Sequence, residues 1–431
     1  MDSFSENSLL LRGARIIAPD RLIQPGSVLI EADRIGPVFD AATSQPPATK
    51  SVIDLEGLTL FPGFIDLHIH GAVGVDTMTA SADDLRRVGE FLARNGVTAW
   101  LPTLVPSAKD QYERAISSIE DAMAQASICD TERRSEYRLQ SGFADSEKDP
   151  TEVGTLNTCH ARILGVHYEG PFVNSEQCGA LHHEHFRHYT GTGDLDSLPT
   201  IKSESVVHMM TLAPEIAGGI ELIKELRKRG WIVSLGHTRA TVDVLDQALV
   251  AGAWHMTHFM NAMRPLHQRA PGPVGWGLLH DDVTCDVIAD GVHIDPMMLK
   301  LILRTKTAER VSLISDAIAA AGLGDGDYEV WGEKISVKNG RTQNARGSIA
   351  GSVITMLDAV RLVLSLGASE IDVARMASTN PARLLGIDRD CGSIEEGKRA
   401  DLVALDQDGN VRLTIVGGQR VSEARPSGRA G

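Results

Sequence analysis

Short apolar runs recur along the middle of the chain and alternate with stretches that have the periodicity of amphipathic helices. Such runs, bounded by turn residues, are typical of buried parallel strands. Eight of them lie within "GFIDLHIHG", "GVTAWLPTLV", "RILGVHYEGPFV", "VVHMMTLAPE", "WIVSLGHT", "AWHMTHFMNAM", "CDVIADGVHI" and "VSLISDAIAAAG". The helix-like stretches between them include "SADDLRRVGEFLARN", "GGIELIKELRKRG" and "TVDVLDQALVAGA". This alternation predicts an α/β fold, a (β/α)8 TIM-like barrel rather than an open sheet.

The two ends of the chain follow a different pattern, with short apolar runs bounded by Gly, Pro and Asp and no helical period. This pattern is typical of β-strands. We therefore expect a small β-sandwich built from both termini, residues 1–61 and 383–431, around a hydrolase barrel of residues 62–382. A polar stretch near residues 126–158 breaks the rhythm and predicts a surface insertion after the second barrel strand.

Composition narrows the classes of partner. The 431 residues carry a formal net charge of −15, which argues against nucleic acid and anionic membranes as partners. No apolar run approaches the roughly 18 residues of a membrane span, and the first residues lack the pattern of a secretory signal. The five cysteines are scattered without a CxxC pair, which indicates a reducing compartment. A cytoplasmic location is the expectation.

Most of the strand-like runs carry, at or just after their ends, a side chain that can bind a metal ion. These side chains are His68, His70, Glu169, His237, His258, His293 and Asp316. The carboxyl ends of barrel strands meet on one face, where active sites lie. Buried separately, each group would need its own partner, whereas one or two divalent cations would satisfy several together. The pattern predicts a metal site that activates water.

Several motifs carry a resemblance to known enzymes. "PGFIDLHIHG" together with "GSIEEGKRADLV" resembles the amidohydrolase superfamily. More narrowly, the chain is similar to the N-acetylglucosamine-6-phosphate deacetylase family in "HYEGPFVN", "LGHT", "THFMNAMRPLHQRAPG", "IADGVHI", "ISDAIAAAG" and "GSIAGS". The resemblance covers nearly the whole chain apart from the polar stretch. It implies hydrolysis of the N-acetyl group of N-acetylglucosamine 6-phosphate, which gives glucosamine 6-phosphate and acetate.

The resemblance also implies how the metal is held. Glu169, His237 and His258 would bind the principal ion, and His68 with His70 would bind a second one. Zn is the expected metal, with Fe, Mn or Co as alternatives, at one or two ions per subunit.

Further roles follow from the same resemblance. Asp316 would be the general acid/base for attack by metal-bound hydroxide, and His293 would bind substrate and polarise the acetyl carbonyl. The other expected substrate-binding residues are Asn261, Ala262, Arg269, His182 and, in the "GSIAGS" loop near the acetyl group, Ile349. The family is usually dimeric, so we expect a homodimer in which Arg269 reaches the neighbouring site.

One loop departs from the family pattern. After "EGP" the family usually has a basic residue followed by Gly, Ala and a phosphate-binding histidine. Here the run reads "CGALHH", with Cys178 at the basic position, Leu181 at the histidine position and His182 one residue later. Either His182 substitutes after a small shift of the loop, or the site has one phosphate donor fewer than the family. Both alternatives concern recognition of the phosphate and not the deacetylation.

Three alternatives remain at this point. The substrate could be another N-acetyl sugar, either N-acetylgalactosamine 6-phosphate or an unphosphorylated N-acetylhexosamine. Cyclic-amide hydrolysis usually requires a modified lysine on the fourth strand, and "VVHMMTLAPE" has none. A non-catalytic binding protein of this superfamily would be expected to have lost metal ligands, whereas this chain keeps the full set. These features favour the amino-sugar deacetylase.

Overall fold

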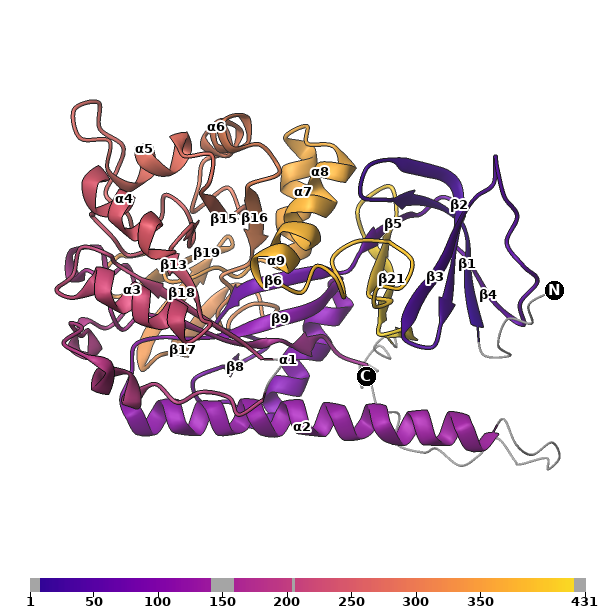
Figure 1. The fold of residues 1–431 in the computed structure, drawn as a ribbon, viewed down its shortest axis with the longest axis horizontal. Coiled ribbons are helices and arrows are strands. Elements are labelled where there is room, and N and C mark those ends of the chain that lie inside the picture. The colour runs from indigo at the N-terminus through magenta and orange to yellow at the C-terminus, as the bar shows by residue number, and fades with distance from the viewer. Residues whose placement is uncertain (1–7, 141–158, 204–205, 422–431) are drawn as a thin grey trace.

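A computed structural model describes residues 8–140, 159–203 and 206–421. A barrel of parallel strands surrounded by helices forms the larger part of the molecule, and a sheet built from both ends of the chain stands beside it (Figure 1). None of the helices in the described ranges is long and apolar enough to cross a membrane.

The barrel consists of parallel strands, each paired with its neighbours in the order of the chain. These strands are β6 (Phe64–Ile69), β9 (Val97–Leu104), β11 (Gly165–Glu169), β12 (Val207–Leu212), β13 (Ile232–Leu235), β14 (His255–Met256), β15 (Thr284–Ile288) and β16 (Val311–Ile314). A parallel bridge between Ile69 and Ala317 joins the last strand to the first. The predicted barrel is confirmed, because each of the eight expected apolar runs contains one of its strands.

The helix α1 (Ala82–Arg94) shows how the sequence folds these units. Ser81 and Asp84 form a capping box that satisfies backbone donors at the first turn. Leu85, Val88 and Leu92 follow at helical spacing and are buried against the barrel. Burial of side chains of this size contributes about 1.5–3 kcal/mol each. The remaining helices outside the barrel are α3 (Gly219–Lys228), α4 (Val242–Ala251), α5 (Gly272–Leu279), α6 (Pro296–Lys306), α7 (Met356–Ser365), α8 (Glu370–Ala374) and α9 (Asn380–Leu384).

The helix α2 (Lys109–Gln140) runs along one side of the barrel and continues past it (Figure 1). Tyr112, Ile116 and Ile119 are buried at helical spacing and fix its first turns. The insertion expected near residues 126–158 therefore begins as an extension of this helix up to Gln140. Residues 141–158 lie outside the described part of the chain.

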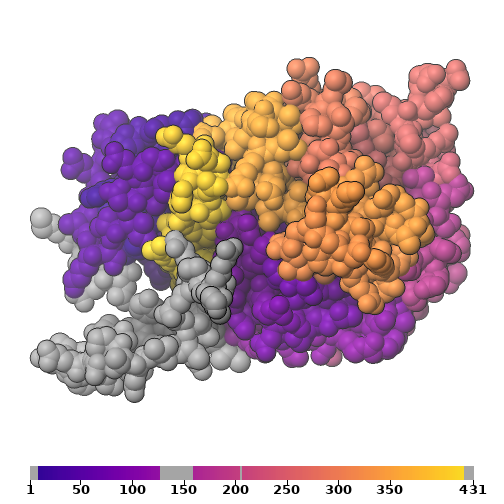
Figure 2. All heavy atoms as spheres, turned by 180° about the vertical axis from the view of Figure 1, so that it is seen from behind, coloured from indigo at the N-terminus to yellow at the C-terminus, as the bar shows by residue number. Residues whose placement is uncertain are grey.

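The second sheet combines strands from both ends of the chain. Its order is β22-β21-β20-β5-β1-β2-β3, with β4 (Ser51–Asp54) also paired to β1. The other strands are β1 (Ser8–Ile17), β2 (Leu22–Glu31), β3 (Arg34–Asp40), β5 (Thr59–Pro62), β20 (Leu402–Leu405), β21 (Val411–Val416) and β22 (Gln419–Arg420). Figure 2 shows the indigo N-terminal and yellow C-terminal segments side by side. A separate apolar core lies under this sheet, whereas the exact domain boundaries stay a prediction.

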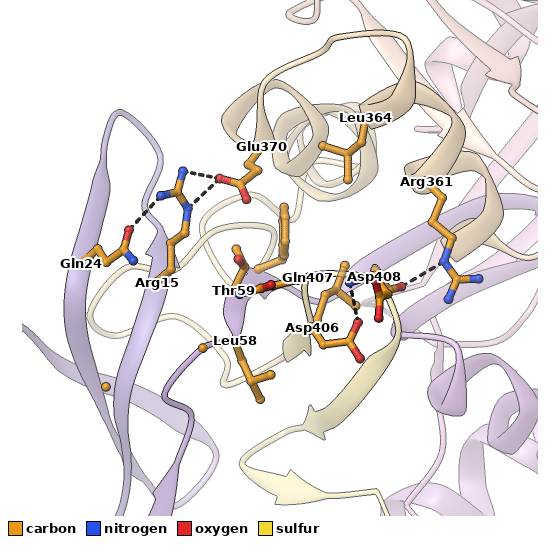
Figure 3. A pocket seen from close by; sticks show the side chains of 15 residues that line it. Arg15, Gln24, Leu58, Thr59, Arg361, Leu364, Glu370, Asp406, Gln407 and Asp408 are labelled. Atoms are coloured by element: carbon orange, nitrogen blue, oxygen red, sulfur yellow. Dashed lines mark hydrogen bonds and ion pairs between the residues drawn. The ribbon is translucent and has the colours of Figure 1, made fainter.

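A cavity of about 600 Å³ lies where the terminal sheet meets the barrel helices (Figure 3). Arg15 on β1 contacts Glu370 at the start of α8 at 2.7 Å. On the opposite wall, Arg361 donates from Nε to the carbonyl of Gly409 at 3.0 Å. Both guanidinium groups thus connect the terminal sheet and its loops to the helices.

Candidate metal centre and active site

The predicted ligands stand at the carboxyl ends of the barrel strands. Glu169 is the last residue of β11, and His237, His258 and Asp316 each lie two residues beyond the end of a strand. These last three residues have positive φ angles of 47°, 32° and 50°. A non-glycine residue in this region costs about 1–3 kcal/mol and persists where the surrounding structure fixes it, often at a functional site. The backbone is therefore bent at the three points where these side chains enter the site.

Glu169 is the centre of the group. Its Oε1 lies 2.9 Å from Nε2 of His237 and 3.0 Å from Nε2 of His258. All three side chains are almost fully buried. Their donor atoms are close enough to bind one metal ion together.

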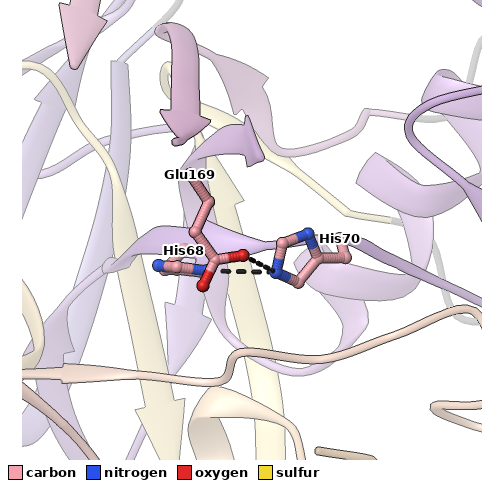
Figure 4. Close-up of side chains that lie close together, drawn as sticks. All are labelled: His68, His70 and Glu169. Carbon is pink, nitrogen blue, oxygen red and sulfur yellow. Dashed lines mark hydrogen bonds and ion pairs between the residues drawn. The ribbon is translucent and has the colours of Figure 1, made fainter. Parts of the chain in front are cut away.

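A second group shares the same carboxylate (Figure 4). The Nε2 atoms of His68 and His70 are 3.1 Å apart, and Oε2 of Glu169 lies 3.3 Å from Nε2 of His70. Asp316 approaches from β16, with Oδ1 at 3.4 Å from His68 Nε2 and 3.3 Å from His70 Nε2. Two adjacent ligand groups with a shared glutamate are thus present.

The charge balance indicates that this site suits a cation. Burial alone would lower the pKa of His70, but Asp316 and Glu169 outweigh it and raise this pKa to about 10. The pKa of His258 is raised to about 9, because Glu169 likewise outweighs burial. Burial would raise the pKa of Glu169, yet its contacts with His237 and His258 hold it well below its usual value. The carboxylates thus favour positive charge at this site, and the imidazole and carboxylate donors fit a divalent cation.

Surrounding groups fix the orientation of the ligands. His237 Nδ1 donates to the carbonyl of Gln177 at 2.8 Å, which leaves Nε2 free to face Glu169. Asp286 accepts from the backbone N–H of His258 and, through its other oxygen, contacts His255 Nε2 at 3.0 Å. Partners of this kind orient metal ligands. The sequence interpretation missed Asp286, whose place on β15 below the site is visible only in the fold.

A further buried layer lies beneath the two histidines of β6. Asp66 accepts from Ser315 Oγ at 2.6 Å and from the backbone N–H of His68 at 3.3 Å. Burial raises the pKa of this carboxyl to about 7. His167 contacts Thr211 Oγ1 at 2.8 Å, and burial lowers its pKa to about 4, so its ring is neutral. His167 is thus a buried, hydrogen-bonded residue. Asp66 could have been found in the sequence from its two-residue spacing to His68.

His293 lies in the loop between β15 and α6 and is held by Asp290. Its Nδ1 is 2.6 Å from Asp290 Oδ2, and the backbone N–H groups of Val292 and His293 donate to Asp290 Oδ1 at 2.8 Å. Burial would raise the pKa of Asp290, but these contacts lower it below its usual value. The ionised carboxylate fixes the ring and leaves Nε2 for another partner. Asp290 is also absent from the sequence prediction, although it precedes His293 by only three residues.

The other predicted substrate-binding residues differ in how far they are buried. Asn261 and Ala262 follow His258 in the same loop and are half-buried, whereas Arg269 is exposed. The Asn261 Nδ2 atom is buried and has no hydrogen-bond partner among the described residues. Ile349 lies half-buried in the loop after β19 (Arg341–Asn344). Their roles in substrate binding stay predictions.

The loop of residues 178–182, which differs from the family pattern, does not place a histidine at the position of Leu181. Leu181 is only 3% exposed and belongs to the main apolar core, so it does not offer a polar replacement for the expected histidine. His182 is half-buried, and its Nε2 lies 3.5 Å from Glu333 Oε1. Glu333 begins strand β18 (Glu333–Lys338) of an antiparallel sheet with β17 (Gly326–Val330) and β19. At the turn before β18, the ring of Trp331 packs edge-on against His70, with ring centroids 5.0 Å apart.

Comparison with known proteins agrees with this geometry. Residues 59–421 match the amidohydrolase family, so the chain belongs to the amidohydrolase family. It is 34% identical over 416 residues to an N-acetylglucosamine-6-phosphate deacetylase of Bacillus subtilis, covering 95% of this chain and 96% of the relative. It is 35% identical over 377 residues to an N-acetylgalactosamine-6-phosphate deacetylase of Escherichia coli O157:H7, covering 87% and 91%.

A solved structure supports the same assignment. The N-acetyl-D-glucosamine-6-phosphate deacetylase of Mycobacterium smegmatis, as a point mutant in complex with N-acetyl-D-glucosamine-6-phosphate, is similar with a TM-score of 0.80 and 31% identity. The match covers 96% of this chain and 100% of that one. The resemblance to amino-sugar deacetylases predicted from the motifs is confirmed by these relatives.

Proposed function

We propose that this protein is a metal-dependent deacetylase that hydrolyses N-acetylglucosamine 6-phosphate to glucosamine 6-phosphate and acetate. The observation that carries the proposal is the pair of ligand groups around Glu169 at the carboxyl face of the barrel. Relatives over 95% of the chain that bear this activity in their names support it.

Glu169, His237 and His258 would hold the principal ion, and His68 with His70 would hold a second one. We propose Zn, because imidazole and carboxylate donors suit it, with Fe, Mn and Co as the other metals to assay. A divalent cation bound there supplies activation of water and polarisation of a carbonyl oxygen.

The side chains of this protein would then move the protons. Asp316, only 7% exposed and beside both ligand groups, would accept a proton from the attacking water. It would return this proton to the departing amine, which is a poor leaving group without it. His293, held by Asp290, would bind the acetyl carbonyl oxygen through Nε2. Asn261, Ala262, Arg269, His182 and Ile349 would line the rest of the substrate site.

We propose a homodimer in the cytoplasm as the working form. Leu266, Leu279 and Met297 are exposed by 51%, 79% and 76%, and the first of them stands near Arg269 in the chain. Large apolar side chains left exposed are candidates for an interface between proteins. Cys178, Cys285 and Cys391 are free thiols in the described part of the chain, which is compatible with a reducing compartment.

Acetate release from four substrates tests the function. The panel contains N-acetylglucosamine and N-acetylgalactosamine, each with and without the 6-phosphate. We expect the highest kcat/KM for N-acetylglucosamine 6-phosphate. The galactosamine epimer is the second candidate, because a relative of that name is 35% identical. A strong preference for either unphosphorylated sugar would overturn the proposal.

A further inference from the structure

The loop of residues 178–182 forms one wall of the site. A Cβ atom built on Gly179 would lie 3.7 Å from His237 Cε1 and 3.8 Å from Ala262 Cβ. The loop is therefore in contact with a metal-ligand candidate on one side and with the predicted sugar-binding segment on the other. A side chain that docks on this loop can reach a substrate held between them.

Arg346 docks on this loop from the β17–β19 sheet. It follows β19 in the chain, and its Nη2 donates to the carbonyl of Ala180 at 2.8 Å. The same Nη2 atom lies 3.5 Å from Glu333 Oε1. The sheet that carries both residues is the orange segment on the near face in Figure 2. Arg346, which follows β19, thus brings a basic side chain to the loop of residues 178–182, where the expected basic residue is replaced by Cys178.

Three side chains around this wall have nitrogen atoms that are not fully used in hydrogen bonds: His182, Asn261 and Arg346. His182 Nε2 and Asn261 Nδ2 are buried atoms without hydrogen-bond partners among the described residues. The contacts of Arg346 with Ala180 and Glu333 both run through Nη2, and its side chain is 38% exposed, so other N–H groups of its planar fork can face a ligand. Glu333 contacts both Arg346 and His182, at 3.5 Å from each. A guanidinium group and an imidazole ring held side by side by one carboxylate offer N–H groups that suit an anion with several acceptor oxygens.

We propose that Arg346, together with His182, is the specificity-determining pair for the phosphate of the substrate. Glu333 positions both side chains over the loop. The pair would bind the phosphate in place of the expected histidine, because Leu181 at that position is buried in the core and has no polar atom in its side chain. This inference deepens the proposed function and rests on it for the identity of the substrate.

The test compares Arg346→Ala with Arg341→Ala in the metal-loaded full-length enzyme. Arg341 is an exposed arginine in the same sheet, paired with Lys338 at the end of the β18–β19 ladder remote from Glu333. We expect Arg346→Ala to raise KM for N-acetylglucosamine 6-phosphate by about 10- to 100-fold, because a charge-assisted hydrogen bond to phosphate is lost. Its kcat should stay within about threefold, because no group at the reacting amide changes. Arg341→Ala should change neither value.

Inorganic phosphate gives a second readout that does not require turnover. Its dissociation constant, measured by calorimetry, should rise by a similar factor in Arg346→Ala and also in His182→Gln, which keeps the test open if the first variant does not fold. Unchanged phosphate binding and unchanged KM in both variants would overturn the inference while the deacetylase function stands. If the wild type released no acetate from any of the four sugars, the proposed function would fail. Phosphate affinity in the same variants would still decide the role of the pair.

Discussion

Asp316→Asn separates the proposed proton shuttle from the metal site. The substitution removes the basic oxygen that would accept a proton and keeps a side chain of nearly the same shape. The backbone tolerates it, because Asn adopts the positive φ of 50° found at this position more readily than other residues do. The backbone N–H of residue 316 still donates to His68 at 2.9 Å, and its carbonyl still accepts from Ser352 at 2.7 Å. The fold around the site should therefore remain.

The expected loss follows from the role. General acid–base catalysis contributes about 10²- to 10⁴-fold, which corresponds to about 3–5 kcal/mol in the activation free energy. We expect kcat for acetate release to fall by that factor and KM to change by less than about threefold. The metal content after dialysis should match that of the wild type, because Glu169, His237 and His258 are unchanged. Asp316→Ala is the matched comparison, since alanine at a positive φ should also cost about 1–2 kcal/mol of stability.

Three measurements decide the matter: acetate release, metal content by atomic emission, and the unfolding midpoint of each variant. A turnover within tenfold of the wild type in Asp316→Asn would refute the assigned role, because proton transfer would then not depend on the Asp316 carboxylate. Loss of metal in that variant would show instead that Asp316 is a ligand, as its 3.3 Å distance to His70 Nε2 permits.

Three further predictions concern the metal and pH. His237→Asn should lose bound metal, measured as ions per subunit after dialysis, and full occupancy would contradict its assignment as a ligand. Removal of the metal by a chelator should destabilise the protein by about 4 kcal/mol relative to enzyme with metal at about 1,000 times Kd, and an unfolding midpoint that does not move would contradict the site. Burial lowers the pKa of His208, whose Nε2 accepts from the backbone N–H of Ile201 at 3.0 Å. The unfolded chain then binds a proton at His208 before the native state does, so stability should fall as pH drops below about 6.5. In His208→Gln, the free energy of unfolding should fall less steeply with decreasing pH than in the wild type. The difference in slope should be less than the full ~1.4 kcal/mol per pH unit, because the ring is partly exposed. Equal slopes of the free energy of unfolding against pH in the two proteins, measured by urea titration, would contradict the argument.

The barrel could be predicted because its strands are buried on both faces. Each therefore appears as a continuous apolar run, and the ligand-type residue at its end is conspicuous against that run. His68 and Glu169 illustrate this, since both lie at strand ends and both converge in the structure. The full length of helix α2 was harder to predict, because the sequence of its later turns is polar and has the composition of a loop. Propensity alone does not separate a polar helix from an insertion.

The groups that orient the ligands were not predictable in the same way. Asp286 lies on β15 and contacts His258 from the next strand, a contact between residues 28 positions apart that depends on barrel order. Arg346 approaches Ala180 across 166 positions. Sequence spacing carries no signal for such pairs, because they are set by how separate elements pack. Asp66 and Asp290 are different, since each lies within three residues of the histidine that it contacts, at His68 and His293.

In the proposed assignment, the residues that would select the substrate come from different elements than the residues that would carry out the chemistry. The candidate ligands and Asp316 come from the barrel strands, where bent backbone and buried hydrogen bonds fix each side chain. The pair His182 and Arg346 comes from a loop and from the edge of an antiparallel sheet, and both side chains are partly exposed. We expect a change in this pair to alter phosphate recognition without disturbing the buried carboxylate of Glu169, on which the ligands converge. In this arrangement Leu181 can lie in the apolar core, at the position where the resemblance predicts a histidine, while the candidate metal ligands keep their places.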